Sequence, residues 1–180
     1  MKDLLVIFVT FIFVNEINAM DLLNNKNIEN YYENLEFISD EVMGGESTGD
    51  LTIISEADDT FIRLTGTVST ENNGGFIQFR SKLNINNEEY KGIKIIAKGL
   101  ESEYYVHIRT NFLFLPWQFY SGKFKVNSKW KEIRILFSDF KKSNFYQPSE
   151  FNSSEIRSIG FVAYGKDFEA ELDLLRAEFF

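Results

Sequence analysis

The residue types that most often do chemistry in proteins are scarce in this sequence. Its 180 residues contain one histidine, His107, and no cysteine. Nucleophilic triads need a histidine beside a serine or cysteine, and zinc or iron sites need several histidine or cysteine ligands. No glycine-rich loop is followed by the lysine that cradles phosphate groups in nucleotide-binding loops. The sequence therefore predicts no catalytic residue, no metal-ligand set and no cofactor.

Acidic residues crowd one short stretch of the chain. Asp40, Glu41, Glu46 and Asp50 fall within or beside the segment Ser39–Gly49. Aspartates in tight loops accept hydrogen bonds from nearby backbone N–H groups, and we favour this structural role. Two alternatives stay open, because loop carboxylates also bind calcium and because a pair of carboxylates suffices to hydrolyse a glycosidic bond. In the hydrolytic alternative, Asp40 or Glu46 would act.

A second group of side chains suits binding rather than catalysis. The alternation of residues 104–110 places Tyr105, His107 and Arg109 on one face of a predicted strand. Aromatic rings beside cationic groups form a platform for stacking on a sugar ring or for anchoring a protein partner. The alternative is that these rings only close the rim of the fold. The candidate binding residues are Tyr105, His107, Arg109, Trp117, Gln118 and Tyr120.

The loops Ser39–Gly49 and Glu71–Gly75 each contain a Gly-Gly pair, and we expect the two loops to be neighbours. Paired glycines indicate a backbone that needs positive φ or close approach to another group. Within the first loop, Val42 and Met43 are predicted to form a short apolar plug. The residues expected to shape the two loops are Asp40, Met43, Gly44, Gly45, Ser47, Gly49, Asn73, Gly74, Gly75 and Phe76.

The pattern of the chain after Leu51 is that of an all-β protein. About nine short segments alternate apolar with polar residues, turn signals separate them, and no long amphipathic helix occurs. The 19 Phe, eight Tyr and two Trp favour strands and supply a large core for one domain. We predict a single-domain antiparallel β-sandwich over residues 39–180, preceded by an irregular lead-in over 20–38.

Residues 1–19 are expected to be a signal peptide. Lys2 precedes an apolar run, Leu4–Val14, and the small residue Ala19 stands at the expected cleavage position. We therefore expect an exported protein, periplasmic or secreted, with an uncleaved signal anchor as the alternative. No other apolar run is long enough to span a membrane once this segment is removed. The net charge of −8 argues against binding to nucleic acid.

Distinctive motifs follow one another along the sequence in a fixed order. They are Asp40-Glu-Val-Met-Gly-Gly-Glu-Ser-Thr-Gly49, Asn72-Asn-Gly-Gly-Phe76, Tyr105-Val-His-Ile-Arg-Thr110, Leu115-Pro-Trp-Gln-Phe-Tyr120 and Ile156-Arg-Ser-Ile-Gly-Phe161. Taken together, these motifs resemble the complex I intermediate-associated protein family, the thirty-kilodalton assembly-factor type. The resemblance covers residues 40–180.

This resemblance implies a galactose-binding-like jelly-roll β-sandwich and a non-enzymatic, chaperone-like role in assembly. Mitochondrial members of the family act in the matrix, whereas this chain begins with an export signal, so only the outward face of a membrane complex would be within its reach. Our leading hypothesis is an exported, non-enzymatic protein that contacts a protein partner or envelope complex through its β-sandwich surface. The first rival is a carbohydrate-binding module, and the second is the sugar hydrolase considered above.

Overall fold

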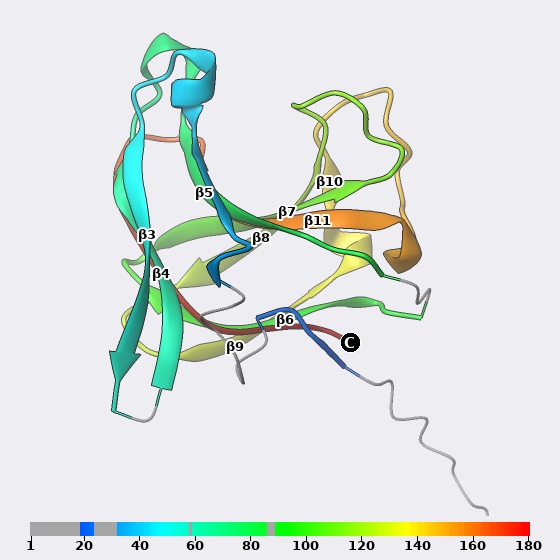
Figure 1. Ribbon diagram of the computed structural model, residues 1–180. Helices are drawn as coiled ribbons and strands as arrows, with labels where there is room; N and C mark the ends of the chain where they lie inside the picture. The colour runs from blue at the N-terminus through cyan, green and yellow to red at the C-terminus, as the bar shows by residue number, and fades with distance from the viewer. Residues whose placement is uncertain (1–18, 24–31, 58, 86–88) are drawn as a thin grey trace, which may run out of the picture.

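A computed structural model describes residues 19–23, 32–57, 59–85 and 89–180. The predicted signal peptide therefore lies outside the described residues, apart from Ala19. The described chain forms a β-sandwich of two antiparallel sheets, which confirms the predicted all-β fold (Figure 1). Among the helices of the described residues, none is long and apolar enough to cross a lipid bilayer.

The first sheet, sheet A, has the order β3-β4-β12-β6-β9, with β1 pairing on β12. Its strands are β1 (Met20–Asp21), β3 (Thr48–Glu56), β4 (Asp59–Val68), β6 (Gly92–Gly99), β9 (Lys131–Leu136) and β12 (Phe168–Phe179). Sheet B has the order β10-β8-β7-β11-β5-β2. Its strands are β2 (Glu36–Ser39), β5 (Phe76–Lys82), β7 (Ser102–Thr110), β8 (Tyr120–Val126), β10 (Lys141–Lys142) and β11 (Ile156–Tyr164).

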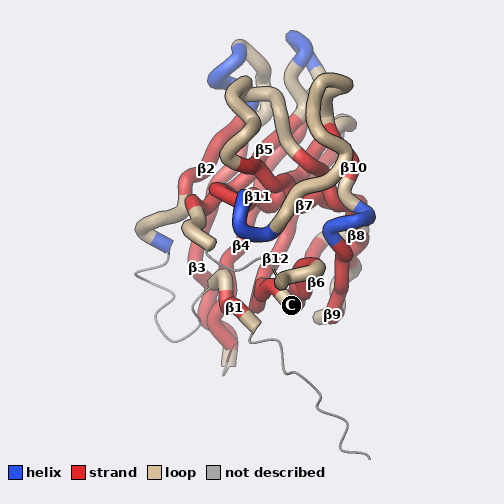
Figure 2. Tube along the Cα trace, turned by 90° about the vertical axis from the view of Figure 1, so that its right-hand side faces the viewer, coloured by secondary structure: helices blue, strands red, loops and turns tan. Residues whose placement is uncertain are grey.

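Within the described residues, four short 3₁₀ turns lie in the connections between strands. They are η1 (Asp40–Met43), η2 (Glu71–Asn73), η3 (Phe137–Asp139) and η4 (Ser153–Glu155). Seen from the side, β5, β11 and β7 lie above β12, β6 and β9 (Figure 2). The loops that carry η1 and η2 rise at one side of sheet B, and the loops that follow β7 and β10 rise at the other (Figure 1).

The core lies between the two sheets, because strands of alternating pattern point one set of side chains inward. Phe79 on β5 and Phe161 on β11 are buried and stack with ring centroids 5.1 Å apart. The predicted lead-in contributes to this structure, since Leu22 and Leu23 are buried and β1 and β2 extend the two sheets. These residues are therefore part of the sandwich rather than an appendage to it.

The two glycine loops are neighbours, as predicted, and Asp40 joins them. Its buried carboxylate accepts hydrogen bonds from the Ser47 backbone N–H (2.8 Å) and hydroxyl (2.5 Å). It also accepts from the backbone N–H groups of Gly75 and Phe76 in the second loop. Backbone and hydroxyl donors on the carboxylate lower the pKa of Asp40 despite its burial, which opposes the shift.

The predicted apolar plug in the first loop is wrong. Val42 and Met43 are exposed, because η1 turns them away from the loop interior while Asp40 faces inward. The turn η1 spans Asp40–Met43 and is capped by the Ser39 side chain, which accepts from the Glu41 N–H. Its left-handed end at Gly44, with φ of 86°, is the positive φ that the Gly-Gly pair predicted.

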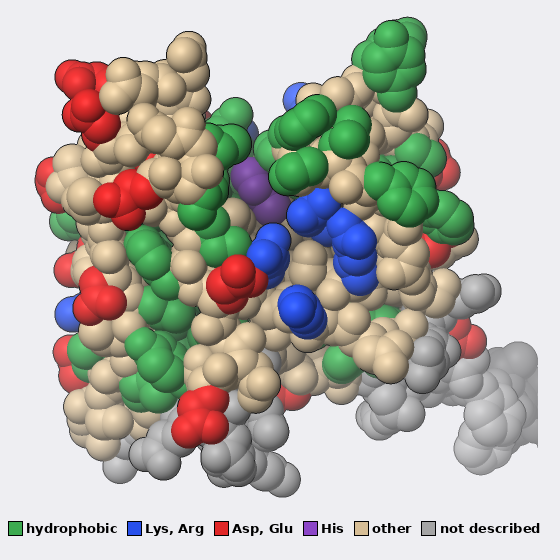
Figure 3. Space-filling view, turned by 45° about the horizontal axis from the view of Figure 1, so that its top comes forward, with side chains coloured by type: hydrophobic (Ala, Val, Ile, Leu, Met, Phe, Trp, Pro, Cys, Tyr) green, Lys and Arg blue, Asp and Glu red, His purple; other side chains and the backbone are tan. Residues whose placement is uncertain are grey.

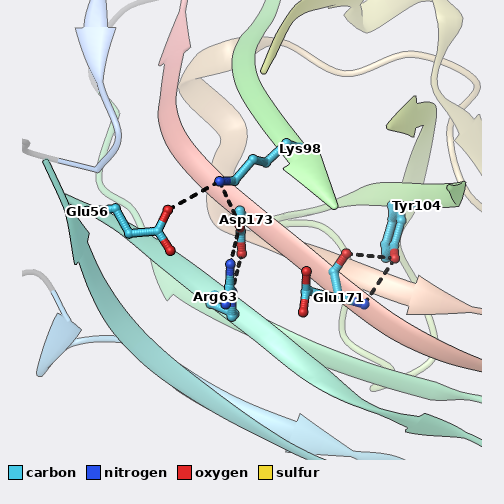
Figure 4. A network of polar contacts seen from close by, with 6 residues as sticks. All are labelled: Glu56, Arg63, Lys98, Tyr104, Glu171 and Asp173. Atoms are coloured by element: carbon cyan, nitrogen blue, oxygen red, sulfur yellow. Dashed lines mark hydrogen bonds and ion pairs between the residues drawn. The ribbon is translucent and has the colours of Figure 1, made fainter. Parts of the chain in front are cut away.

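Charged side chains on the outer face of sheet A form a network of polar contacts (Figure 4). Arg63 on β4 donates two hydrogen bonds to the buried carboxylate of Asp173 on β12, at 2.6 and 2.7 Å. Lys98 on β6 lies 3.7 Å from Asp173 and covers the rings of Phe61 and Trp130. Arg63, Asp173 and Lys98 are thus paired with one another on this face.

Candidate functional site

A groove crosses the outer face of sheet B between the two groups of loops (Figure 3). The strand register defines its floor, because residues paired across antiparallel strands project from the same face. One row across the floor consists of Ser121 on β8, His107 on β7, Gly160 on β11, Arg80 on β5 and Glu36 on β2. His107, the only histidine, is visible in the hollow, with basic side chains beside it (Figure 3).

One half of the groove is aromatic. His107 stacks on Phe119, with ring centroids 3.9 Å apart and ring planes inclined by 16°. Tyr164, at the end of β11, lies edge-on to both His107 and Tyr105, with centroids 5.8 Å away in each case. The four rings come from β7, β11 and the loop before β8, so they form a surface that no single segment provides.

His107 is neutral at neutral pH. Removal of its imidazole from water lowers the pKa to about 3, because burial penalises the charged form. Its Nε2 atom is out of contact with solvent and has no hydrogen-bond partner among the described residues. A polar atom in this state carries a free-energy penalty that a ligand donor or acceptor would relieve.

The other half of the groove is basic. Arg109 on β7 donates a hydrogen bond of 2.9 Å to the Leu115 carbonyl, and Arg157 on β11 donates one of 2.6 Å to the Leu113 carbonyl. Burial, together with the positive charges of Arg157 and Arg80, lowers the pKa of Arg109. Arg80 alone among the three has a carboxylate partner within the described residues, Glu36 at 2.6 Å.

The wall on the side of β7 and β10 ends in an apolar rim, which we define as Phe112, Phe114, Leu115, Trp117, Phe145 and Tyr146, all exposed. Phe114, Phe145 and Tyr146 are more than four-fifths exposed, at 82%, 84% and 87%. The two loops of the rim are tied together. The Ser143 hydroxyl donates to the Trp117 carbonyl and accepts from the Phe119 N–H, and the Gln147 amide donates to the Phe119 carbonyl. The rim is therefore held in place although its rings meet solvent.

The structure brings most of the predicted binding residues to this groove and its wall. Tyr105, His107 and Arg109 share the outer face of β7, as the alternation predicted. Trp117 is on the rim, and the Gln118 side chain accepts a hydrogen bond from the Leu115 N–H at the base of the same loop. Tyr120 does not belong to the site, because it points into the core and its hydroxyl donates to the Pro148 carbonyl.

Four residues of the groove were not predicted from the sequence: Phe119, Tyr164, Arg80 and Arg157. Phe119 had a signal, since strand alternation that points Tyr120, Phe124 and Val126 inward must point the preceding residue outward. No local sequence pattern indicated Arg80 and Arg157, because only the strand pairing brings β5 and β11 beside β7.

The carboxylates of Asp40 and Glu46 near the first loop accept hydrogen bonds from this chain. Asp40 is surrounded by donors of this chain, and Glu46 accepts a hydrogen bond from the Asn72 side chain at 3.0 Å. Within the ranges that the structure describes, no three of the His, Asp and Glu side chains gather as metal ligands do. The favoured interpretation of Asp40 as a hydrogen-bond acceptor in a tight loop is confirmed.

Similar solved structures include several carbohydrate-binding modules. The family 11 module from Clostridium thermocellum, solved in complex with a β-1,3-1,4-mixed-linked tetrasaccharide, is 17% identical with a TM-score of 0.69, over 89% of this chain and 94% of the module. The family 30 module of a cellulosomal cellulase from Clostridium thermocellum is 14% identical with a TM-score of 0.51, over 82% of this chain and 91% of that module. These likenesses confirm the predicted jelly-roll sandwich.

No curated protein sequence matches the chain. The sequence model of one family, described as complex I intermediate-associated protein 30 (CIA30), matches residues 24–174. This match spans most of the chain and confirms the resemblance carried by the loop and strand motifs. The protein therefore belongs to the complex I intermediate-associated protein 30 family.

Proposed function

We propose that the protein is a non-enzymatic glycan-binding module and that an extended oligosaccharide lies in the groove across sheet B. The observation that carries this proposal is the aromatic half of the groove, where His107 and Phe119 stack and Tyr164 and Tyr105 adjoin them. Sugar rings bind proteins by laying their apolar C–H face on such aromatic surfaces, with polar groups at the edges. This proposal places the carbohydrate hypothesis ahead of the protein-partner hypothesis that led our sequence analysis.

The shape of the groove suits a chain rather than a single sugar. Its floor runs across β8, β7, β11, β5 and β2, and strands in a sheet lie about 4.8 Å apart, so the floor is roughly 20 Å long. Aromatic rings and guanidinium groups both line it. The fold of the family 11 module, solved with a bound tetrasaccharide, supports the same class of ligand.

Calorimetric titration of the purified protein with a panel of soluble glycans tests the proposal. We expect saturable binding to at least one glycan, and a loss of about tenfold or more in Tyr164→Ala and in Phe119→Ala. Tyr146→Ala is the matched control, since it removes an exposed ring outside the aromatic half of the groove. Melting curves of each variant confirm folding. Absence of binding to every glycan of the panel, or an equal loss of affinity in Tyr146→Ala, would refute the proposal.

The apolar rim favours a second candidate function, binding of a protein partner such as an envelope complex. Six apolar side chains on two tied loops meet solvent together, and exposed patches of this kind mark interaction sites. An export signal at residues 1–19 would bring the rim to the periplasmic or extracellular space, where an assembly role would be exercised. Crosslinking in cell envelopes separates the candidates: partner capture lost in a Phe114→Ser/Phe145→Ser variant but kept in Tyr164→Ala would favour this one.

A further inference from the structure

The basic half of the groove is unusual for this chain. The protein carries a net charge of −8, and yet both Arg80 and Arg157 lie within electrostatic range of Arg109. Lys82 extends the group, because its register partner Ser158 also pairs with Arg109. Like charges held together oppose folding unless an opposite charge compensates them.

The chain itself supplies little compensation. Glu36 pairs with Arg80, but within the described residues no carboxylate lies within ion-pair distance of Arg109 or Arg157. Each of these two guanidinium groups has a hydrogen bond to one backbone carbonyl, out of five N–H donors. These bonds hold the guanidinium groups at the foot of the loop wall, and the other N–H donors of the two groups have no partner within the described residues.

One of these donors is buried without a partner. The Nε atom of Arg109 is out of contact with solvent and makes no hydrogen bond within the described residues, as is also true of Nε2 of His107, two residues earlier on the same face of β7. The two unpartnered atoms belong to residues on one face of β7, and buried polar groups without a partner require an explanation, which a bound ligand would provide.

We propose that Arg80, Arg109 and Arg157 bind the acidic group of an anionic saccharide, a carboxylate or a sulfate ester, while its ring stacks in the aromatic half of the groove. A guanidinium fork matches the paired oxygens of either group, and charge-assisted hydrogen bonds of this kind are the stronger ones. The inference rests on the proposed function, glycan binding in this groove, and assigns the class of glycan.

The distance across the groove, along β7, supports the pairing of these two halves. His107 belongs to the aromatic half, and Arg109 follows it by two residues on the same strand face, which is about 6.6 Å along an extended strand. A pyranose ring on the aromatic surface would therefore hold an acidic substituent near the guanidinium of Arg109. Neutral glycans would leave the orphaned Nε and the basic charges uncompensated.

The test compares four probes by calorimetry at low and high salt: an oligogalacturonate, a sulfated oligosaccharide, a neutral mixed-linkage β-glucan oligosaccharide and polyglutamate. We expect one or both acidic saccharides to bind at least tenfold more tightly than the neutral one, with affinity falling as salt screens the charges. The two acidic arms distinguish carboxylate from sulfate. Equal binding of polyglutamate would overturn the inference, since it would show capture of any polyanion.

Substitutions test whether the preference for acidic saccharides comes from the arginines of the groove. Arg109→Gln and Arg157→Gln should each weaken the acidic saccharide about tenfold or more, and Arg109→Lys should restore part of the loss. Arg134→Gln on sheet A, an exposed residue paired with Glu132, makes the same change in net charge and should have no effect. Melting temperatures identify any variant that fails to fold, and Arg109→Lys then provides the measurement.

The outcomes separate this inference from the function on which it rests. Neutral oligosaccharide binding as tightly as the acidic ones would overturn the inference and leave glycan binding established. Absence of binding to any saccharide would overturn both. Acidic binding that is lost equally in Arg134→Gln would also overturn the inference, because the effect would then follow net charge rather than the groove.

Discussion

His107 lies flat against Phe119, with the two ring centroids 3.9 Å apart. The stack buries the imidazole beside a hydrocarbon ring, and the pKa of His107 falls to about 3 for that reason. An unfolded histidine titrates near pH 6.5, so between these two values the unfolded chain binds a proton that the native one does not. The stability of the protein should therefore decline as pH falls through this window.

Urea unfolding at pH 7 and pH 5 measures this decline. We expect the native protein to lose stability on going to pH 5, and His107→Gln to lose less, because glutamine has no proton to gain. Asp40 acts in the same sense but at lower pH, since its lowered pKa gives stability that is lost only as pH falls below the ordinary pKa of aspartate. An identical pH dependence in the variant would show that His107 is solvated.

Asp40→Asn should destabilise the protein by roughly 1.5–3 kcal/mol. The carboxylate receives four hydrogen bonds from Ser47, Gly75 and Phe76, and an amide would replace one acceptor oxygen with a further donor. Asp50→Asn is the control, because Asp50 is exposed and, among the described residues, accepts only from the adjacent Leu51 N–H in a bond of 2.8 Å. Chemical denaturation of both variants measures their free energies of unfolding. Equal losses of stability would contradict the role of Asp40 in linking the two loops.

Adjacent glycines in the first loop are needed for different reasons. Gly44 has a φ of 86° with open space where a Cβ would project, so Gly44→Ala should cost only the backbone strain, about 1–2 kcal/mol. A Cβ at Gly45 would lie 2.3 Å from the Asp40 carboxyl carbon, so Gly45→Ala must displace that carboxylate and should cost about 3 kcal/mol. Melting temperatures in the reverse order would disprove this assignment.

Asp173→Asn should cost roughly 3 kcal/mol, because it leaves Arg63 without its buried bidentate partner on sheet A. The exposed pair of Glu132 with Arg134 offers a contrast, and Glu132→Gln should change the free energy of unfolding by less than about 1 kcal/mol. Neither change touches sheet B, so glycan binding in both variants should equal that of the native protein while they remain folded.

Much of the fold and part of the site were predictable from local pattern. Alternation along residues 104–110 placed Tyr105, His107 and Arg109 on one face correctly, because a strand fixes the direction of each side chain. The proximity of the two glycine loops was predicted from the Gly-Gly pair that each contains. The conformational demands of those loops are local, and Gly44 displays them in its positive φ.

What could not be predicted depends on pairing between distant segments. Arg80 and Arg157 reach Arg109 only through the order β7-β11-β5, which no local window contains. Tyr120 was wrongly predicted to face the binding surface, because the loop after Thr110 breaks the alternation of β7. Its inward direction follows instead from the alternation of β8, in which Phe124 and Val126 also point inward. The same alternation would have identified Phe119 as the ring that faces the groove.

The position of β12 in sheet A has a consequence for how the chain folds. This strand lies between β4 and β6 and also carries β1, yet it follows all three in the sequence. Before Phe168–Phe179 has been synthesised, β4 and β6 have no strand between them, so one edge of each strand stays unpaired. Sheet A should therefore form late and in one step, and a chain cut before Phe168 should aggregate rather than fold.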